Sequence, residues 1–301
     1  MPLIAALAVA SAVVSLAAFF GGLYWLLDLP AAFRPQLTLV LLILGGLLAL
    51  GRWRKTATAV GLVALVNLIV VSPLFLPSER AATSQLRILS FNVLARNENY
   101  EQVVAFIRQS EADLVVLHEA SLPWEEALAA ADLGYVISVN RHPDDIFSSI
   151  VLAPEGAVVE SYGFRLADPR AVSIEMSSGV SVLAIHPLSP YNEERADLRD
   201  RQLQWAGEWV GRQNGLVIIA GDFNASPFSY PYRRLRASTG LRDSARGYGL
   251  ELSYPAEESP FLQVSIDHLL YSDGLEVVDR VLGPSLGSDH YSLTVDLAVA
   301  P

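Results

Sequence analysis

The chain contains no cysteine, and it has only five histidines among 301 residues. The absence of cysteine excludes disulfide bonds and thiolate chemistry, and it is compatible with either side of a membrane. Charge is scarce in the first 81 residues, which hold two acidic and five basic side chains, whereas residues 82–301 hold thirty acidic and sixteen basic ones. These parts therefore carry formal charges of +3 and −14, which together give −11. Residues 82–301 are therefore too acidic to provide the positive electrostatic field that attracts nucleic acid. This does not exclude nucleic acid as a substrate.

Long apolar runs fill the N-terminal third, at residues 3–27, 36–51 and 56–76. Crossing the hydrocarbon core of a bilayer takes about 20 apolar residues, so the first and third runs are long enough. The second run is shorter, and we expect it to use Ala32, Phe33 and a snorkelling Arg34 at its edge. A cleaved signal peptide is the alternative for the first run, but that run lacks a basic leading region and two more apolar runs follow. The sequence therefore predicts an anchor of three transmembrane helices over residues 1–77.

The orientation of this anchor follows from its loops. The loop between the second and third runs is strongly basic, with Arg52, Arg54 and Lys55. Basic loops tend to stay in the cytoplasm, which places the N-terminus inside and everything after the third helix outside. Residues 78–84 are then a short linker, and residues 85–301 form one large domain. We expect a multi-pass protein of the cell (inner) membrane whose large domain is extracytoplasmic.

The large domain alternates short apolar strands with amphipathic helices. Helices are predicted at residues 100–110 and 193–212. Strands are predicted at residues 86–93, 113–117, 135–139, 149–151, 158–162, 172–176, 180–185, 216–220, 264–270, 276–282 and 291–297. Helices between some strands and hairpin-like pairs elsewhere favour an α/β sandwich, with two packed mixed sheets flanked by helices.

Carboxylate, amide and imidazole side chains follow or end several of these strands within a span of 70 residues near the C-terminus. The motifs are Gly221-Asp222-Phe223-Asn224, Ile266-Asp267-His268 and Gly287-Ser288-Asp289-His290. Carboxylates hold a hard divalent cation, an amide positions a nucleophile, and imidazole supplies a proton or positive charge. The glycine before Asp222 permits a close approach of the backbone. Together these groups indicate metal-assisted cleavage of a phosphoester.

Three earlier residues also stand at strand ends, and each has an ordinary structural explanation. Asn92 could be a turn residue, Glu119 could begin the next turn, and His186 could be a hydrogen-bonded histidine at a strand terminus. His118 is expected to pack beside the site or to support a ligand. The coincidence of so many acids and imidazoles at strand ends favours a catalytic site over independent surface residues.

In this order the motifs resemble those of the endonuclease/exonuclease/phosphatase superfamily, over about residues 86–297. The matching segments are Phe91-Asn92-Val93, His118-Glu119, His186-Pro187, Gly221-Asp222-Phe223-Asn224, Ile266-Asp267-His268 and Ser288-Asp289-His290. The resemblance implies a four-layered α/β sandwich and a requirement for Mg²⁺ or a similar cation such as Mn²⁺ or Ca²⁺. The anchor and the segment 186–202 most resemble a membrane-tethered bacterial branch of this superfamily.

The resemblance also implies roles for single residues. Glu119 would bind the metal with Asn92 beside it and with Asp289 completing the shell. Asp222 would activate the attacking water and Asn224 would support it. His290, polarised by Asp267, would contact the phosphate, and His186 would stabilise the developing charge or assist the leaving oxygen. The family commonly has glutamine where this chain has His118, which leaves the surroundings of the metal ligand open.

These features predict a membrane-anchored, metal-dependent phosphoesterase, most simply a phosphodiesterase, that acts on lipid-linked or small phosphodiesters. Its partners would be that phosphoester and the lipid bilayer, and no protein partner can be inferred. The alternative substrate is extracellular or periplasmic nucleic acid, which would make the protein a nuclease. A non-catalytic scaffold that keeps the fold is a different class of answer. The intact set of acids and imidazoles argues against a scaffold, because a site without catalysis has no need of it.

Overall fold

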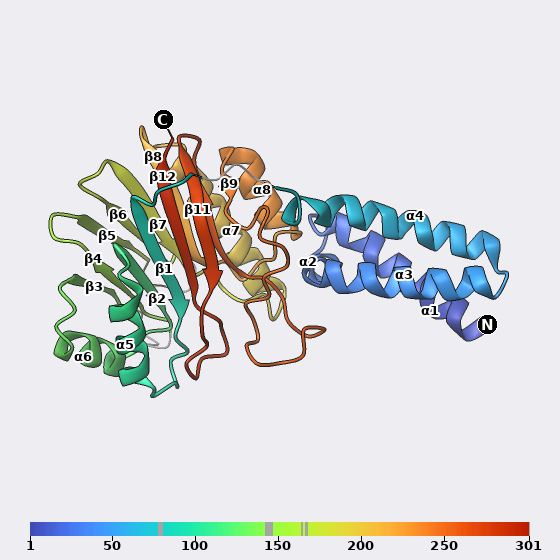
Figure 1. Ribbon diagram of the computed structural model, residues 1–301, viewed down its shortest axis with the longest axis horizontal. Coiled ribbons are helices and arrows are strands. Elements are labelled where there is room, and N and C mark those ends of the chain that lie inside the picture. Colours follow the sequence, from blue (N-terminus) through green and yellow to red (C-terminus); the bar gives the residue numbers. More distant parts are fainter. Residues whose placement is uncertain (78–80, 142–146, 164, 166–167, 301) are drawn as a thin grey trace. The chain divides into compact units, whose positions relative to one another are not determined.

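The computed structural model describes residues 1–77, 81–141, 147–163, 165 and 168–300 (Figure 1). The chain separates into two compact units. The first comprises Met1–Pro77, Ala225–Arg233 and Arg246–Leu250, and the second comprises Ser78–Asn224, Arg234–Ala245 and Glu251–Pro301. The long apolar helices belong to the first unit, and both β-sheets belong to the second. Of the expected linker, residues 78–80 lie outside the described part of the chain.

Three long apolar helices dominate the first unit. They are α1 (Pro2–Ala17), α3 (Arg34–Leu50) and α4 (Arg54–Val71), accompanied by α2 (Trp25–Asp28) and the 3-10 turns η1 (Ala18–Phe20), η2 (Leu29–Phe33) and η3 (Ser72–Leu74). The continuous helical segments Pro2–Phe20, Trp25–Leu50 and Arg54–Leu74 are long and apolar enough to cross a membrane. The segment Trp25–Leu50 begins before the apolar run predicted at residues 36–51, because α2 and η2, which include Asp28, precede α3.

Arg34 corrects one expectation about this unit, because it does not snorkel toward an edge. Its side chain is only 1% exposed, and its Nη1 donates to Oδ1 of Asn67 at 2.6 Å. Nδ2 of Asn67 donates in turn to Oγ of Ser15, also at 2.6 Å, so one polar chain joins α3, α4 and α1. The guanidinium lies over the ring of Phe19, 4.1 Å from its centroid. A buried arginine is costly without partners, and these contacts direct it inward.

The second unit contains two six-stranded sheets. The first sheet has the order β11-β12-β1-β2-β4-β3 and the second has the order β5-β6-β7-β8-β10-β9. The first sheet comprises β1 (Leu86–Asn92), β2 (Leu114–His118), β3 (Val136–Asn140), β4 (Ser149–Ala153), β11 (Leu275–Leu282) and β12 (Leu293–Val299). The second comprises β5 (Val158–Tyr162), β6 (Ala171–Glu175), β7 (Val180–Ile185), β8 (Leu216–Asp222), β9 (Arg242–Asp243) and β10 (Asp267–Tyr271).

Each sheet is mixed and contains one parallel pair. In the first sheet β1 and β2 are parallel, and in the second β7 and β8 are parallel, while the other neighbours are antiparallel. A parallel pair needs a crossover connection, and here helices supply it. The helix α5 (Tyr100–Ser110) connects β1 to β2, and α7 (Glu193–Val210) connects β7 to β8. The two pairs therefore present the carboxyl ends of their strands together.

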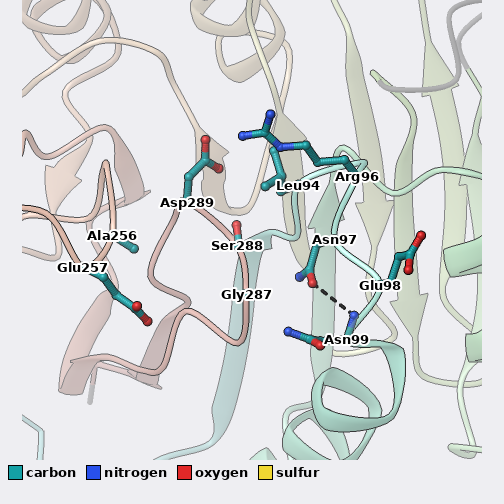
Figure 2. Close-up of a pocket in the computed structure, with 10 residues that line it drawn as sticks. All are labelled: Leu94, Arg96, Asn97, Glu98, Asn99, Ala256, Glu257, Gly287, Ser288 and Asp289. Atoms are coloured by element: carbon teal, nitrogen blue, oxygen red, sulfur yellow. Dashed lines mark hydrogen bonds between the residues drawn. The ribbon is translucent and has the colours of Figure 1, made fainter.

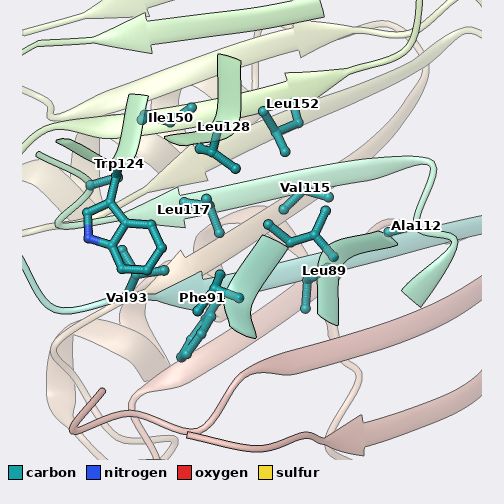
Figure 3. Packing of buried hydrophobic residues seen from close by; sticks show 13 residues of the cluster. Leu89, Phe91, Val93, Ala112, Val115, Leu117, Trp124, Leu128, Ile150 and Leu152 are labelled. Atoms are coloured by element: carbon teal, nitrogen blue, oxygen red, sulfur yellow. The ribbon is translucent and has the colours of Figure 1, made fainter. Parts of the chain in front are cut away.

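Helices cover the first sheet through a continuous hydrophobic core (Figure 3). Val103 and Ile107 of α5, with Trp124 and Leu128 of α6 (Leu122–Ala130), pack against apolar side chains of β1, β2 and β4. On the second sheet, Trp205 of α7 lies 5.0 Å from the ring of Tyr162 in β5. Two sheets with helices outside confirm the expected four-layered sandwich. The apolar alternation of the strands is what makes this layering favourable.

The predicted elements agree with the structure at most positions, and three elements are additional. The helices α6 and α8 (Tyr230–Thr239) and the two-residue strand β9 were not predicted. The amphipathic signal of α6 is weak because Glu125 and Glu126 are its only polar residues, so apolar side chains lie on nearly every side of the helix. The strand expected to begin at residue 264 begins at Asp267, because Val264 instead forms an isolated bridge with Tyr254.

Candidate active site

The predicted site residues gather at the carboxyl ends of the two parallel strand pairs. Asn92 ends β1 and is paired with His118 at the end of β2, so Glu119 is the next residue along. On the second sheet, His186 follows β7 and Asp222 ends β8. The neighbouring β10 runs antiparallel and begins at Asp267, which is paired directly with Asp222. Residues as distant in the sequence as Asn92 and Asp222, which are 130 positions apart, thus meet at one edge of the sandwich.

Gly221 allows the two strands of the second pair to approach each other at this edge. Its φ of 143° lies in a region that L side chains rarely adopt. A Cβ at this position would collide with the carbonyl oxygen of Ile185 and would lie 2.7 Å from Nε2 of His118. The sequence predicted a close approach of the backbone at Gly221. The structure explains it, because Ile185 of β7 and His118 of the other sheet leave no room for a side chain.

Asp222 is buried and held by amide groups. The backbone N–H of Asn224 donates to its Oδ1 at 2.9 Å, and Nδ2 of Asn92 donates to its Oδ2 at 3.2 Å. Nδ2 of Asn224 lies 3.4 Å from the same Oδ2 and 3.0 Å from the carbonyl oxygen of Pro187. Burial raises the pKa of Asp222 to about 7. A carboxylate in this range can accept a proton from water near neutral pH.

His290 and Asp267 form a buried imidazole–carboxylate pair. Nδ1 of His290 lies 2.9 Å from Oδ2 of Asp267, and its Nε2 lies 3.7 Å from Oδ2 of Asp222. Burial alone would lower the pKa of His290, but the two carboxylates outweigh it and raise the pKa to about 10. Burial also opposes ionisation of Asp267, yet the charge and hydrogen bond of His290 lower its pKa. The pair therefore consists of an imidazolium and a carboxylate.

Glu119 and His186 complete the arrangement from opposite sheets. Oε1 of Glu119 accepts from Nδ2 of Asn92 at 3.1 Å and lies 3.8 Å from Nε2 of His186. Nε2 of His186 is 3.5 Å from Oδ2 of Asp222. The Glu119 side chain is 24% exposed, more than the nearly buried His186. Burial and the charge of Arg170 lower the pKa of His186 well below its ordinary value.

The donor set fits a hard divalent cation on the Glu119 side of the site. Asp222, Asp267 and His290 offer ligand atoms within 4.8 Å of one another, but a protonated imidazole has no free lone pair for a metal. Glu119 instead combines a carboxylate with exposure to solvent, beside the Asn92 amide. In the present orientation Nδ2 of Asn92 faces Glu119 while Oδ1 accepts from the backbone N–H of Leu94 at 3.1 Å, so ligation by Asn92 beside Glu119 requires its amide to rotate.

Asp289 lines a pocket beside these residues. The pocket has a volume of about 530 Å³ and is lined by Leu94, Arg96, Asn97, Glu98, Asn99, Ala256, Glu257, Gly287, Ser288 and Asp289 (Figure 2). The pocket is polar and opens next to His290, where a group attached to a bound phosphate could extend.

Several residues that support the site were not predicted from the sequence. Oγ of Ser288 donates to the carbonyl oxygen of Asn92 at 2.6 Å and accepts from the backbone N–H of His290 at 3.0 Å. The ring of Tyr254 packs on that of His290, with centroids 4.7 Å apart. The carbonyl oxygen of His186 accepts from Nε of Arg170 at 2.9 Å. Only Ser288 had a local signal, because it belongs to the quoted Ser-Asp-His motif.

His118, which was expected to pack beside the site, and His268, which follows Asp267, both lie beside the catalytic groups. Nδ1 of His118 is 3.0 Å from Oγ of Ser149, and its ring centroid lies 5.2 Å from that of His186. Burial lowers the pKa of His118 to about 3. The ring of His268 meets Phe223 edge-on, at 5.1 Å.

Comparison with protein families gives one decisive match. The model of the endonuclease/exonuclease/phosphatase family matches residues 89–290, about two thirds of the chain. The chain belongs to this family. Its members are generally hydrolases that act on phosphoesters and use divalent metals. The matched region begins within β1 and ends at His290, so it includes every residue of the site described above.

Solved structures with the same fold include both eukaryotic and bacterial proteins. Truncated Caenorhabditis elegans TDP2 has a TM-score of 0.56 and 16% identity, covering 71% of this chain and 98% of that one. D. rerio TDP2 complexed with a single-strand DNA product has a TM-score of 0.58 and 14% identity, covering 71% and 99%. The human Nocturnin catalytic domain with bound sulfate has a TM-score of 0.52 and 17% identity, covering 73% and 98%. No curated protein matches the chain.

Proposed function

We propose that this protein is a membrane-anchored, metal-dependent phosphodiesterase that acts on lipid-linked or small phosphodiesters outside the cytoplasm. The observation that carries the catalytic part is the meeting of five side chains at one edge of the sandwich, joined by contacts of 3.1 to 3.8 Å: Asn92, Glu119, His186, Asp222 and His290. The family supports hydrolysis of phosphoesters. The three apolar helical segments support the anchor, with boundaries at residues 1–77, 78–84 and 85–301.

The metal would be held by Glu119, with Asn92 and Asp289 available to complete its oxygen ligands, and Mg²⁺ is the ion we favour over Mn²⁺ or Ca²⁺. When bound, it would supply positive charge to the phosphate oxygens. Asp222 takes the proton of the attacking water, since its pKa near 7 lets it act as a base at neutral pH. Asn224 keeps the Asp222 carboxylate in place through the hydrogen bond of its backbone N–H.

His290 binds a phosphate oxygen as an imidazolium held by Asp267. A charged donor in a water-excluded position stabilises negative charge that grows on the phosphate in the transition state. Tyr254 packs against one face of the ring and limits its movement. His186 faces the same position from β7 and acts on the phosphate from another side. The polar pocket beside Asp289 leaves room for a small group attached to the phosphorus.

The substrate preference can be tested with the full chain in detergent or in lipid nanodiscs. A panel of phospholipids, inositol phosphates, nucleotides and DNA would be assayed with and without Mg²⁺. We expect a lipid or small phosphodiester to be hydrolysed fastest and only with the cation, while an Asp222→Asn variant serves as the inactive control. DNA is disfavoured because residues 82–301 carry a formal charge of −14. A clear preference for DNA would replace the leading substrate with the nuclease alternative.

The topology predicts where two fusions should be active. A reporter that works only after export, fused after Leu76, should be active, because the basic loop after α3 keeps residues 52–55 in the cytoplasm. The same reporter fused after Gly51 should be inactive and serves as the matched control. The opposite pattern would place the site in the cytoplasm and would reopen intracellular nucleic acid as a substrate.

A further inference from the structure

Arg170 and His186 are neighbours because of the register of two antiparallel strands. Ala171 at the start of β6 is paired with Ile185 at the end of β7, so Arg170 and His186 are the next residues at that end. The backbone N–H of His186 donates to the carbonyl oxygen of Arg170 at 3.2 Å. Arg170 has a φ of 52°, in the left-handed region that non-glycine residues seldom occupy. Such a conformation persists where surrounding contacts enforce it.

The side chain of Arg170 is fixed against the back of the His186 ring. Its exposed fraction is 5%, and its Nε donates to the carbonyl oxygen of His186 at 2.9 Å. Its Nη2 lies 3.4 Å from Nδ1 of His186. The guanidinium lies 4.4 Å from the ring centroid of Phe147, and the ring of His118 lies beside that of His186. Arg170 therefore contacts the Nδ1 edge of the imidazole, while Nε2 faces the catalytic carboxylates.

These contacts determine which nitrogen of His186 carries hydrogen. A guanidinium only donates, so the nitrogen that faces it must accept and cannot carry a hydrogen of its own. We propose that Arg170 holds His186 in the tautomer with hydrogen on Nε2, so that His186 donates a hydrogen bond to a non-bridging phosphate oxygen and gives no proton to the leaving oxygen. Arg170 is thus a positioning residue that acts through His186.

The opposite nitrogen of the ring faces the site in agreement with this assignment. Nε2 of His186 lies 3.5 Å from Oδ2 of Asp222 and 3.8 Å from Oε1 of Glu119, so its hydrogen points toward acceptors. His290 is arranged the other way round, because a carboxylate of Asp267 accepts at its Nδ1. Arg170 can only donate to His186, and the Asp267 carboxylate can only accept from His290. The two imidazoles therefore have different hydrogen-bonding roles.

The inference rests on the proposed function and decides between the two roles that the family resemblance allows for His186. His186 keeps the same proton while the bond between phosphorus and the leaving oxygen breaks and the bond to water oxygen forms. Asp222 takes the proton of that water, and the leaving oxygen departs with the bonding electron pair and takes its proton from solvent. Its contribution is then a hydrogen bond that strengthens as charge develops on phosphate. That contribution does not depend on how basic the leaving group is.

The tautomer can be measured directly in the full chain. With ¹⁵N-labelled histidine, the His186 signals would be assigned by their loss in His186→Gln and read for protonation of each ring nitrogen. In the parent protein we expect Nδ1 of His186 to be unprotonated and Nε2 to carry hydrogen. In Arg170→Met we expect a mixture of the two tautomers. Arg170→Lys keeps a donor and should restore much of the parent pattern. A protonated Nδ1 in the parent protein would overturn the proposal.

The catalytic consequence can be measured with aryl phosphodiesters whose leaving phenols differ in pKa. His186→Ala should lose turnover by roughly 10²–10³-fold, equally for every leaving group. Arg170→Met should lower kcat by about tenfold, with KM changed by less than about twofold, because only part of the protein then keeps the competent tautomer. A loss in His186→Ala that grows with the basicity of the leaving group would show proton transfer and would refute the assignment.

A matched control separates this effect from loss of a buried arginine. Arg280 is 4% exposed and is paired with Glu251 and Ser244, away from His186. Arg280→Met should leave the His186 tautomer unchanged whatever it does to stability, and a changed tautomer there would contradict a specific role for Arg170. Absence of hydrolysis in the parent would refute the proposed function, while the ¹⁵N measurement would still test the tautomer.

Discussion

Replacing Glu119 by alanine is expected to abolish most turnover while the protein stays folded. Glu119 is the partly exposed carboxylate beside Asn92, and its removal deprives the bound cation of its main anionic ligand. We expect a loss of about 10³-fold or more, comparable with the removal of a principal electrostatic group in other hydrolytic sites. The measurement is the initial rate on the best phosphodiester at saturating Mg²⁺, together with the melting temperature.

The parent protein should lose all activity in excess chelator and regain it when Mg²⁺ is added. Glu119→Gln should behave like Glu119→Ala, since it keeps the shape of the side chain but removes its charge. Glu155, an exposed acid in the turn after β4, is the matched control, and Glu155→Ala should retain parental rates. Full activity in chelator, or in Glu119→Ala, would remove the metal from the mechanism.

Replacing His290 by alanine is expected to lower turnover by at least about 10²–10³-fold, or roughly 2.7–4 kcal/mol of barrier. The reason is that Asp267 is hydrogen-bonded to His290 and stabilises the charged form of its ring. Asp267→Asn should lose somewhat less, because the ring remains but its orientation and charge are less well supported. Both variants should be assayed for kcat and KM beside their melting temperatures.

His268 provides the matched control for His290, because both are buried histidines next to an acid of the site. The ring of His268 packs against Phe223. His268→Ala should therefore cost stability more than turnover, and His118→Ala should do the same because it packs on His186. An inactive His118→Ala together with a fully active His290→Ala would show that the site has been assigned to the wrong imidazoles.

Local patterns in the sequence indicated most of the elements and most of the candidate site. Strand alternation located β1, β2, β7 and β8 to within about two residues, and polar residues directly after them marked Asn92, Glu119, His186 and Asp222. These signals are local. A strand shows a periodic pattern of apolar residues, and catalytic groups at the end of a strand come directly after that pattern in the sequence.

Contacts between distant parts of the chain could not be predicted in this way. Arg34 was expected at a membrane edge but is buried against Asn67, a residue 33 positions away. Arg170 gave no signal, since a basic residue before a strand is ordinary until the register of β6 and β7 brings it to His186. Asp289 was grouped with Glu119 on the basis of its motif, and its role as a metal ligand stays a prediction.

The sequence by itself determined three apolar spans, a chain of alternating strands and helices, and the chemical groups of a phosphoesterase. Only the tertiary structure decided which strands are parallel, which acid faces which imidazole, and which histidine is paired with a carboxylate or an arginine. The physical reason is that composition and periodicity act within a few residues. The charge and hydrogen-bonding state of His186 and His290 depend instead on partners brought close by strand pairing.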